Sequence, residues 1–237
     1  NFFIISDEVY CAWYKCGHLF YFQSYKNFYP DILTLSKSMG GGKSSISAFI
    51  AKTNLYDKVY GSIDNAFLHT TTYNGFGEEC ATAIEAINIL IEEKFDEKVK
   101  SLEKHIVTSL QDIKTKFPKI VKNFQGSGAL FGIEFNSPIE FISNIVGLVD
   151  IDIINNKKKL ISKLYVAAIS DELFKKYNIM SNISESDNSD FLYISPSLIA
   201  EKKHIDYFFQ SLSKVLSNKL DFKLSRYLLK SVINLIK

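Results

Sequence analysis

Two short apolar runs near the start of the chain each lead to a charged residue. Residues 2–5 precede Asp7, and residues 32–35 precede Lys37, after which three glycines follow at positions 40–42. Short runs of apolar and β-branched residues with a glycine breaker behind them predict buried strands. Ligands of open α/β sheets bind at the carboxyl ends of strands, so Asp7 and Lys37 are candidate site residues.

A helical repeat of apolar positions predicts three long helices further along the chain, at residues 78–94, 99–113 and 205–216. Shorter helices are expected at residues 54–60 and 154–164. The apolar positions that define the long helices are Cys80, Ala81, Ile84, Ile87 and Ile91 in the first, Val99, Leu102, Ile106, Leu110 and Ile113 in the second, and Ile205, Phe208, Phe209, Leu212 and Leu216 in the third.

Further strands alternate with these helices. Strand-like segments are expected at residues 47–51, 165–169 and 192–195, and residues 126–135 are expected to be a glycine turn that leads into a strand. The Ser, Asn and Asp content of residues 181–190 predicts a polar loop. The mixture of strands and helices along one chain is typical of an α/β fold.

Composition excludes several broad classes of protein. The chain has 237 residues, 46% of them hydrophobic, with a net charge of +2, which is typical of a globular protein and offers no broad basic surface to nucleic acid. No apolar run approaches the ~20 residues of a membrane span, and the chain begins with a core-like strand, so we expect no membrane partner and a cytoplasmic location.

The three cysteines predict neither a metal site nor a disulfide framework. Cys11, Cys16 and Cys80 form an odd and sparse set without the spacing of zinc ligands. We interpret them as small hydrophobic residues of a reducing compartment.

Lys37 has alternative interpretations when its surroundings are considered alone. A lysine before a loop is commonly an exposed surface residue, whereas a lysine at a strand end in an apolar site can lose its proton and attack a carbonyl. Residues 42–44 (Gly-Lys-Ser) imitate the end of a nucleotide-binding P-loop, but that motif needs a glycine where Lys37 stands. We therefore discard the nucleotide site.

The order of several short motifs resembles the class III (ornithine-type) pyridoxal-phosphate aminotransferases. The resemblance covers most of residues 1–217. Its motifs are Asp7-Glu8-Val9, then Pro30-Asp31-Ile32, then Lys37 before Gly40-Gly41-Gly42, then His69 to Gly75, then Gly126 to Glu134, and finally Leu192 to Leu198.

The resemblance implies a fold type I transferase that uses pyridoxal 5'-phosphate to move an amino group between an amine or amino acid and an oxo acid. It implies that Lys37 carries the cofactor covalently, that Asp7 pairs with the pyridine nitrogen, and that Val9 packs against the ring. Tyr10 is expected to offer its hydroxyl to the ring. Thr72 is expected to reach the cofactor phosphate of a neighbouring subunit, which implies a homodimer with shared sites. No metal ion is expected.

The same resemblance suggests how the chain divides. Residues 1–94 correspond to the remainder of a large cofactor domain, residues 95–218 to a small domain with its linking helix, and residues 219–237 to an extra helix. Members of the family have a substantial half before their Asp-Glu-Val strand, so the chain is expected to be a fragment that lacks it. Asp7 and Lys37 can cooperate only if their two strands are neighbours.

Two features keep other functions open. The segment from Tyr10 to Gly17 stands where the family has a Gln-Thr-Gly-x-Gly-Arg-Thr-Gly sequence, and almost every residue differs. That difference and the absent half suggest a non-catalytic remnant or interaction subunit as one alternative. The other is an aminomutase or epimerase of the same family, because Asp7 and Lys37 serve those reactions equally.

Overall fold

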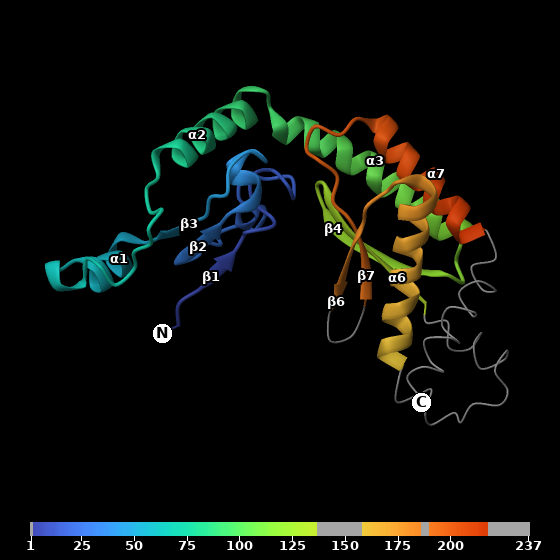
Figure 1. The fold of residues 1–237 in the computed structure, drawn as a ribbon, viewed down its shortest axis with the longest axis horizontal. Coiled ribbons are helices and arrows are strands. Elements are labelled where there is room, and N and C mark those ends of the chain that lie inside the picture. The colour runs from blue at the N-terminus through green and yellow to red at the C-terminus, as the bar shows by residue number, and fades with distance from the viewer. Residues whose placement is uncertain (1, 137–157, 186–189, 218–237) are drawn as a thin grey trace. The chain divides into compact units, whose positions relative to one another are not determined.

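A computed structural model describes residues 2–136, 158–185 and 190–217 of the chain (Figure 1). The chain divides into two compact units, residues 1–101 and 102–237, which we describe separately. Helix α3 (Phe95–Lys116) crosses the boundary between them. The division after residue 94 that the sequence predicts stays a prediction, and the predicted helix at residues 219–237 lies outside the described residues.

The first unit is built on a three-stranded sheet with the order β1-β2-β3. Strand β1 (Ile5–Asp7) pairs in parallel with β2 (Ile32–Leu35), which pairs in antiparallel with β3 (Ala48–Ala51). The side chains of Leu33 and Leu35 are 5% and 2% exposed, so β2 forms the buried centre of this sheet. The predicted strands at residues 32–35 and 47–51 are confirmed.

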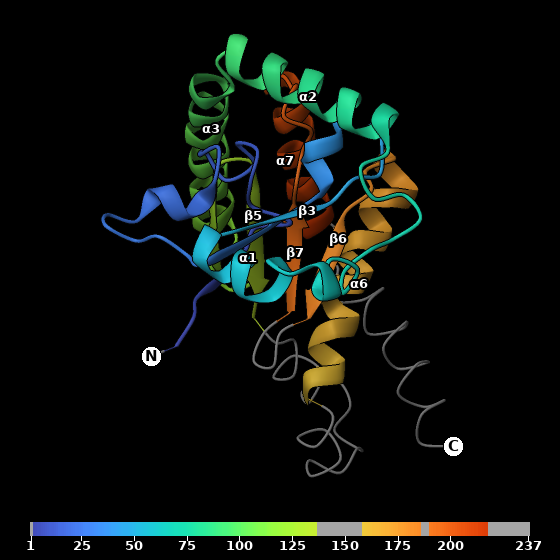
Figure 2. The same cartoon turned by 90° about the vertical axis from the view of Figure 1, so that its left-hand side faces the viewer.

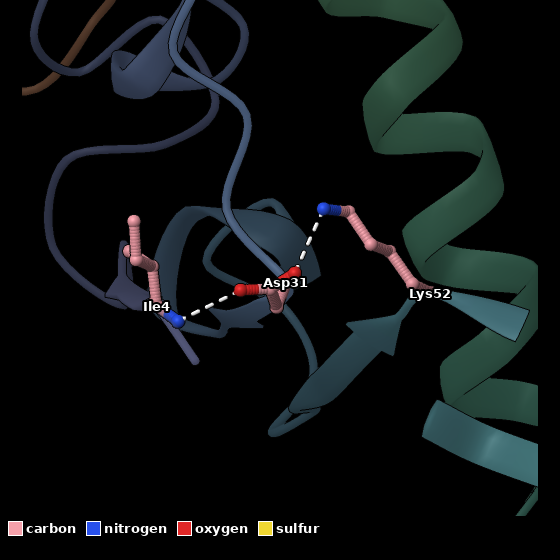
Figure 3. A network of polar contacts seen from close by, with 3 residues as sticks. All are labelled: Ile4, Asp31 and Lys52. Carbon is pink, nitrogen blue, oxygen red and sulfur yellow. Dashed lines mark hydrogen bonds and ion pairs between the residues drawn. The ribbon is translucent and has the colours of Figure 1, made fainter. Parts of the chain in front are cut away.

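Asp31 lies immediately before β2, and its side chain links the ends of all three strands. One carboxylate oxygen accepts a hydrogen bond from the backbone N–H of Ile4 at 2.9 Å, and the other lies 2.7 Å from the Nζ of Lys52, which follows β3 (Figure 3). Backbone bonds add to this contact, because the N–H of Asp31 donates to the carbonyl of Ile4 and the N–H of Lys52 donates to the carbonyl of Asp31. The ion pair with Lys52 and the bond from Ile4 lower the pKa of the Asp31 carboxyl.

The helical elements of the first unit lie between and after these strands in the sequence. They are η1 (Tyr21–Ser24), η2 (Lys37–Gly40), α1 (Thr53–Tyr60), η3 (Ile63–Asn65) and α2 (Gly77–Glu92). The helix predicted at residues 78–94 is therefore confirmed, but its buried side is not the predicted one. Ala83 and Leu90 are buried, whereas Ile84 and Ile91 are 61% and 51% exposed. Apolar residues occur all around α2, so periodicity alone does not select the face that packs on η2.

The second unit is a four-stranded antiparallel sheet covered by helices. Its strands are β4 (Val121–Ser127), β5 (Leu130–Phe135), β6 (Asn182–Glu185) and β7 (Asp190–Ile194), in the order β4-β5-β7-β6. Helices α3, α6 (Lys158–Tyr177) and α7 (Lys202–Ser217) lie along one face of this sheet (Figure 1, Figure 2). The two layers confirm the predicted α/β class.

The core of this unit follows the helical repeat that the sequence shows. The predicted positions from Val99 to Ile113 and from Ile205 to Leu216 are all buried. Ile133 and Leu192 of the sheet and Ile169 of α6 are also fully buried. His105 lies beside this core, and its Nε2 is 2.7 Å from the Oδ1 of Asp206, which joins α3 to α7.

Two predictions for the second unit are wrong. Residues 165–169 were expected as a strand because Tyr, Val and Ile favour strands, but they lie within α6, where Tyr165, Val166 and Ile169 are buried. Tertiary packing overrides local propensity here. Residues 182–185 were expected within a polar loop but form β6, an edge strand whose pairing with β7 satisfies its backbone.

The network at Asp31 yields a pH-dependent prediction. Its folded pKa is lower than the value of about 3.9 in an unfolded chain, so its contribution to stability is present above that value and is lost as the pH falls through the folded pKa. Asp31→Asn is expected to lower the melting temperature at about pH 7, and this difference should shrink toward about pH 3. Thermal unfolding across that range measures it. The control is Asp64→Asn, at an exposed residue of η3, which reports the general effect of losing a carboxylate. The prediction would be contradicted if the melting temperatures of wild type and Asp31→Asn differed by the same amount at every pH.

Candidate active site

Asp7 and Lys37 lie at the same edge of the first unit's sheet. Because β1 and β2 run in parallel with Asp7 opposite Thr34, both strands present their carboxyl ends on one side. Lys37 follows Thr34 by three residues, so its Cα lies at most about 11 Å from that of Thr34 along the chain. The structure therefore meets the condition that the two strands be neighbours.

The carboxylate of Asp7 is held by the strand beside it and by its own turn. The hydroxyl of Thr34 donates a hydrogen bond to Oδ1 at 3.0 Å, and the backbone N–H of Val9 donates to the same atom at 3.1 Å. Among the described residues, no group donates to Oδ2 of Asp7, and the side chain is exposed. One oxygen thus fixes the carboxylate, and the other is open to a donor from outside the chain.

Lys37 occupies a constrained position at the first residue of η2. Its φ angle is 49°, in the left-handed region that residues other than glycine seldom adopt. The hydroxyl of Ser36 donates to the carbonyl of Ile46 at 2.9 Å and closes the turn. On the far side of the turn, a Cβ atom on Gly41 would lie only 3.0 Å from the Cβ of Ala86, so this glycine lets α2 approach closely.

The amine of Lys37 meets the ring of Tyr10. The Nζ atom lies 4.6 Å from the ring centroid, a distance typical of a cation–π contact. Tyr10 follows β1 by three residues and is 39% exposed. The contact joins the ends of β1 and β2 through side chains, and it places an aromatic ring and a hydroxyl next to the lysine amine.

Glu8 positions the segment that follows β1, a role that the sequence analysis missed. Its side chain is 2% exposed and accepts hydrogen bonds from the backbone N–H groups of Tyr21 and Phe22, the latter at 2.6 Å. The hydroxyl of Ser6 donates to it at 3.3 Å. Successive side chains of an extended chain alternate between its two faces, so the sequence predicts Glu8 on the face opposite to Asp7, and this signal was available before the structure.

The other predicted site residues are less closely tied to this cluster. Val9 contributes its backbone N–H to Asp7, and its side chain is half-buried. Thr72 is exposed in a turn before α2, and no contact joins it to Asp7, Tyr10 or Lys37 among the described residues. The structure therefore brings Asp7, Val9, Tyr10 and Lys37 together, and it does not bring Thr72 to them.

Residues 2–136, 158–185 and 190–217 hold no group of three or more His, Cys, Asp or Glu side chains that is suited to a metal ion. Their helices are too short or too polar to cross a membrane.

Solved structures of aminotransferases resemble this chain in fold. A transaminase from the marine bacterium Virgibacillus matches with a TM-score of 0.72 and 17% identity over 95% of this chain and 46% of that protein. Ornithine aminotransferases of Plasmodium falciparum and Plasmodium yoelii match with TM-scores of 0.67 and 0.66, at 24% and 25% identity, over 92% of this chain in both cases and 48% and 49% of those proteins. The chain spans about half the length of these proteins.

The family model described as aminotransferase class-III matches residues 1–216. This match includes both units and nearly the whole of the described chain. It also includes the strand ends that carry Asp7 and Lys37. The chain therefore belongs to the class III aminotransferase family.

Proposed function

We propose that the protein is a pyridoxal-phosphate-dependent aminotransferase in which Lys37 holds the cofactor. The observation that carries the proposal is the parallel register of β1 and β2, which sets Asp7 and Lys37 at one sheet edge. Membership of the class III family supports it. The proposed substrates are a primary amine or amino acid and an oxo acid, and the expectation of a cytoplasmic location stays a prediction.

The residues at this edge suit the cofactor. When bound, pyridoxal phosphate supplies a ring that withdraws electrons from the substrate carbon, and the protein supplies position and charge. The open Oδ2 of Asp7 is suited to a protonated ring nitrogen, and the primary amine of Lys37 is suited to a carbonyl carbon. The hydroxyl of Tyr10 is suited to a ring oxygen near the lysine.

Each residue has a distinct task in this proposal. The negative charge of Asp7 holds a proton on a ring nitrogen, because opposite charges stabilise each other's ionised forms. The Nζ of Lys37 would move a proton to and from the substrate carbon as a general base and acid. Thr34 keeps the Asp7 carboxylate in one orientation, so that its charge needs no reorganisation during turnover.

The same residues would serve an aminomutase or an epimerase of this family. An aminotransferase releases the oxo acid of its amino donor in stoichiometric amounts and retains the amino group on the cofactor. The other two reactions return an amine as their product. Product analysis with one equivalent of donor and no acceptor separates these outcomes.

The covalent role of Lys37 is directly testable. Sodium borohydride reduces the bond that a lysine amine forms with the carbonyl carbon of the cofactor. After this reduction the cofactor stays attached to the lysine permanently. Trypsin does not cleave after the modified lysine, so the adduct is expected on a peptide of residues 27–43 that retains Lys37. Mass spectrometry of this peptide locates the modification.

Lys43, in the same glycine turn, offers a matched control for this experiment. Lys37→Arg is expected to abolish the adduct, and Lys43→Arg is expected to retain it. An adduct on Lys43, or an unmodified Lys37 in a loaded and active protein, would exclude the assignment.

Asp7→Asn is expected to slow turnover without unfolding the protein. Asparagine retains an Oδ1 that can accept from Thr34 and Val9, so the melting temperature should change little. Losing the charge that holds a proton on the ring should reduce kcat at least ~100-fold, equivalent to about 2.7 kcal/mol of activation free energy. Asp57→Asn, on the exposed side of α1, is the control. Near-normal kcat in Asp7→Asn would show that Asp7 is only structural.

We further propose that the active unit is a homodimer in which Thr72 reaches the cofactor phosphate of the neighbouring subunit. Its exposed position, apart from its own chain's Asp7 and Lys37, supports this proposal. Lys37→Ala and Thr72→Ala chains should each have low activity alone. After subunit exchange, half of the dimers are mixed and have one undamaged site, so activity should recover toward roughly one quarter of the wild-type value. No recovery despite demonstrated exchange would contradict shared sites.

A further inference from the structure

The turn after β1 brings two cysteine side chains together. Cys11 and Cys16 are both reduced, and their side chains form a hydrogen bond with each other. The backbone N–H of Cys16 also donates to the carbonyl of Cys11 at 3.2 Å. With standard backbone bond lengths, that bond keeps the two Cα atoms within about 7 Å of each other. Separations in this range are those that a disulfide spans.

The backbone of this turn is tightly constrained. Trp13 and Tyr14, which lie between the cysteines, both have positive φ angles, 59° and 63°. Their N–H groups donate to the carbonyls of Leu19 and His18, at 2.6 Å and 2.9 Å, and so double the chain back on itself. Two consecutive bulky residues in the left-handed region persist only where the surrounding structure holds them, so the closeness of the thiols is a defined property of the turn.

The two thiols differ in exposure, as the two members of an exchanging pair do. Cys11 is partly exposed, whereas Cys16 is 5% exposed. The hydrogen bond from the Cys16 thiol lowers the pKa of Cys11 to about 7, and the same bond together with burial raises the pKa of Cys16. A partly exposed thiolate is the nucleophile of thiol–disulfide exchange, and a buried neighbouring thiol completes the reaction.

We propose that Cys11 and Cys16 form a reversible dithiol–disulfide pair, a modification site oxidised by low-molecular-weight disulfides such as oxidised glutathione. Cys11 immediately follows Tyr10, whose ring contacts the amine of Lys37, so the pair lies next to the candidate active site in the chain. The pair does not depend on pyridoxal phosphate or on transamination, and it goes beyond the proposed function.

Oxidation proceeds in two exchange steps. The Cys11 thiolate attacks one sulfur of the small disulfide, forms a mixed disulfide and releases one thiolate. Cys16 then loses its proton and attacks the Cys11 sulfur, which forms the intrachain disulfide and releases the second thiolate. The two protons from the protein thiols end on the two released thiols, so two cysteines are oxidised and one small disulfide is reduced.

The sequence provides a clean assay for this disulfide. Trypsin cleaves after Lys15, between the two cysteines, and the flanking sites give peptides of residues 1–15 and 16–26. The protein is equilibrated in glutathione redox buffers, blocked with iodoacetamide under denaturing conditions, digested and analysed by mass spectrometry. In oxidising buffer the two peptides are expected to remain linked, at a mass lower than their sum by two hydrogen atoms. Reduction with dithiothreitol should separate them.

The third cysteine gives the matched control. Cys80→Ser is expected to retain the linked peptides, whereas Cys11→Ser and Cys16→Ser abolish them. In Cys16→Ser, Cys11 should stop at the mixed disulfide, and the pH midpoint of its alkylation should rise above about 7. The proposal would be overturned if oxidised glutathione left Cys11 and Cys16 unlinked, if it gave only a stable mixed disulfide in the wild type, or if the linkage involved Cys80. These outcomes are independent of whether Lys37 carries a cofactor.

Discussion

The parallel pairing of β1 with β2 is the constraint on which the candidate site depends. Parallel strands cannot be joined by a tight hairpin, so the chain must travel from Asp7 to Ile32 before the second strand is added. Asp31 holds the beginning of this pairing through Ile4 and Lys52. Because Asp31 holds the amino ends of β1 and β2, it sets the register between the two strands. Asp7 and Lys37 then lie together at the carboxyl ends. The connecting segment is anchored by the buried carboxylate of Glu8 and includes the turn that contains both cysteines.

The helices whose buried side the sequence predicts correctly are those whose buried positions recur with a single helical period. Helices α3 and α7 were predicted correctly, because their apolar residues form one stripe and every predicted position is buried. The prediction for α2 selected the wrong face, since apolar residues surround that helix. Residues 165–169 were predicted as a strand but belong to a helix. A short run of β-branched and aromatic residues fits either a strand or part of a buried helix, and only the flanking residues distinguish the two.

The candidate site was predictable as far as its two charged residues. Asp7 and Lys37 could be recognised because each follows an apolar run and because the order of motifs around them resembles the class III aminotransferases. Their proximity depends on strand pairing, which spacing does not reveal. The contact of Lys37 with Tyr10 and the approach of Cys11 to Cys16 depend on backbone angles in turns. Nothing in residue type indicates that Trp13 and Tyr14 adopt left-handed angles, since such angles favour glycine and asparagine. Residue type alone therefore favours the interpretation of the cysteines as small hydrophobic residues.

The left-handed backbone of Lys37 also has a consequence for stability. At a φ of 49°, glycine or asparagine would relieve a strain of order 1 kcal/mol or more that a lysine imposes. The turn would therefore be more stable without a lysine at this position. The strain accompanies the placement of an amine beside the ring of Tyr10, so the local fold and the candidate site make opposite demands on this one residue.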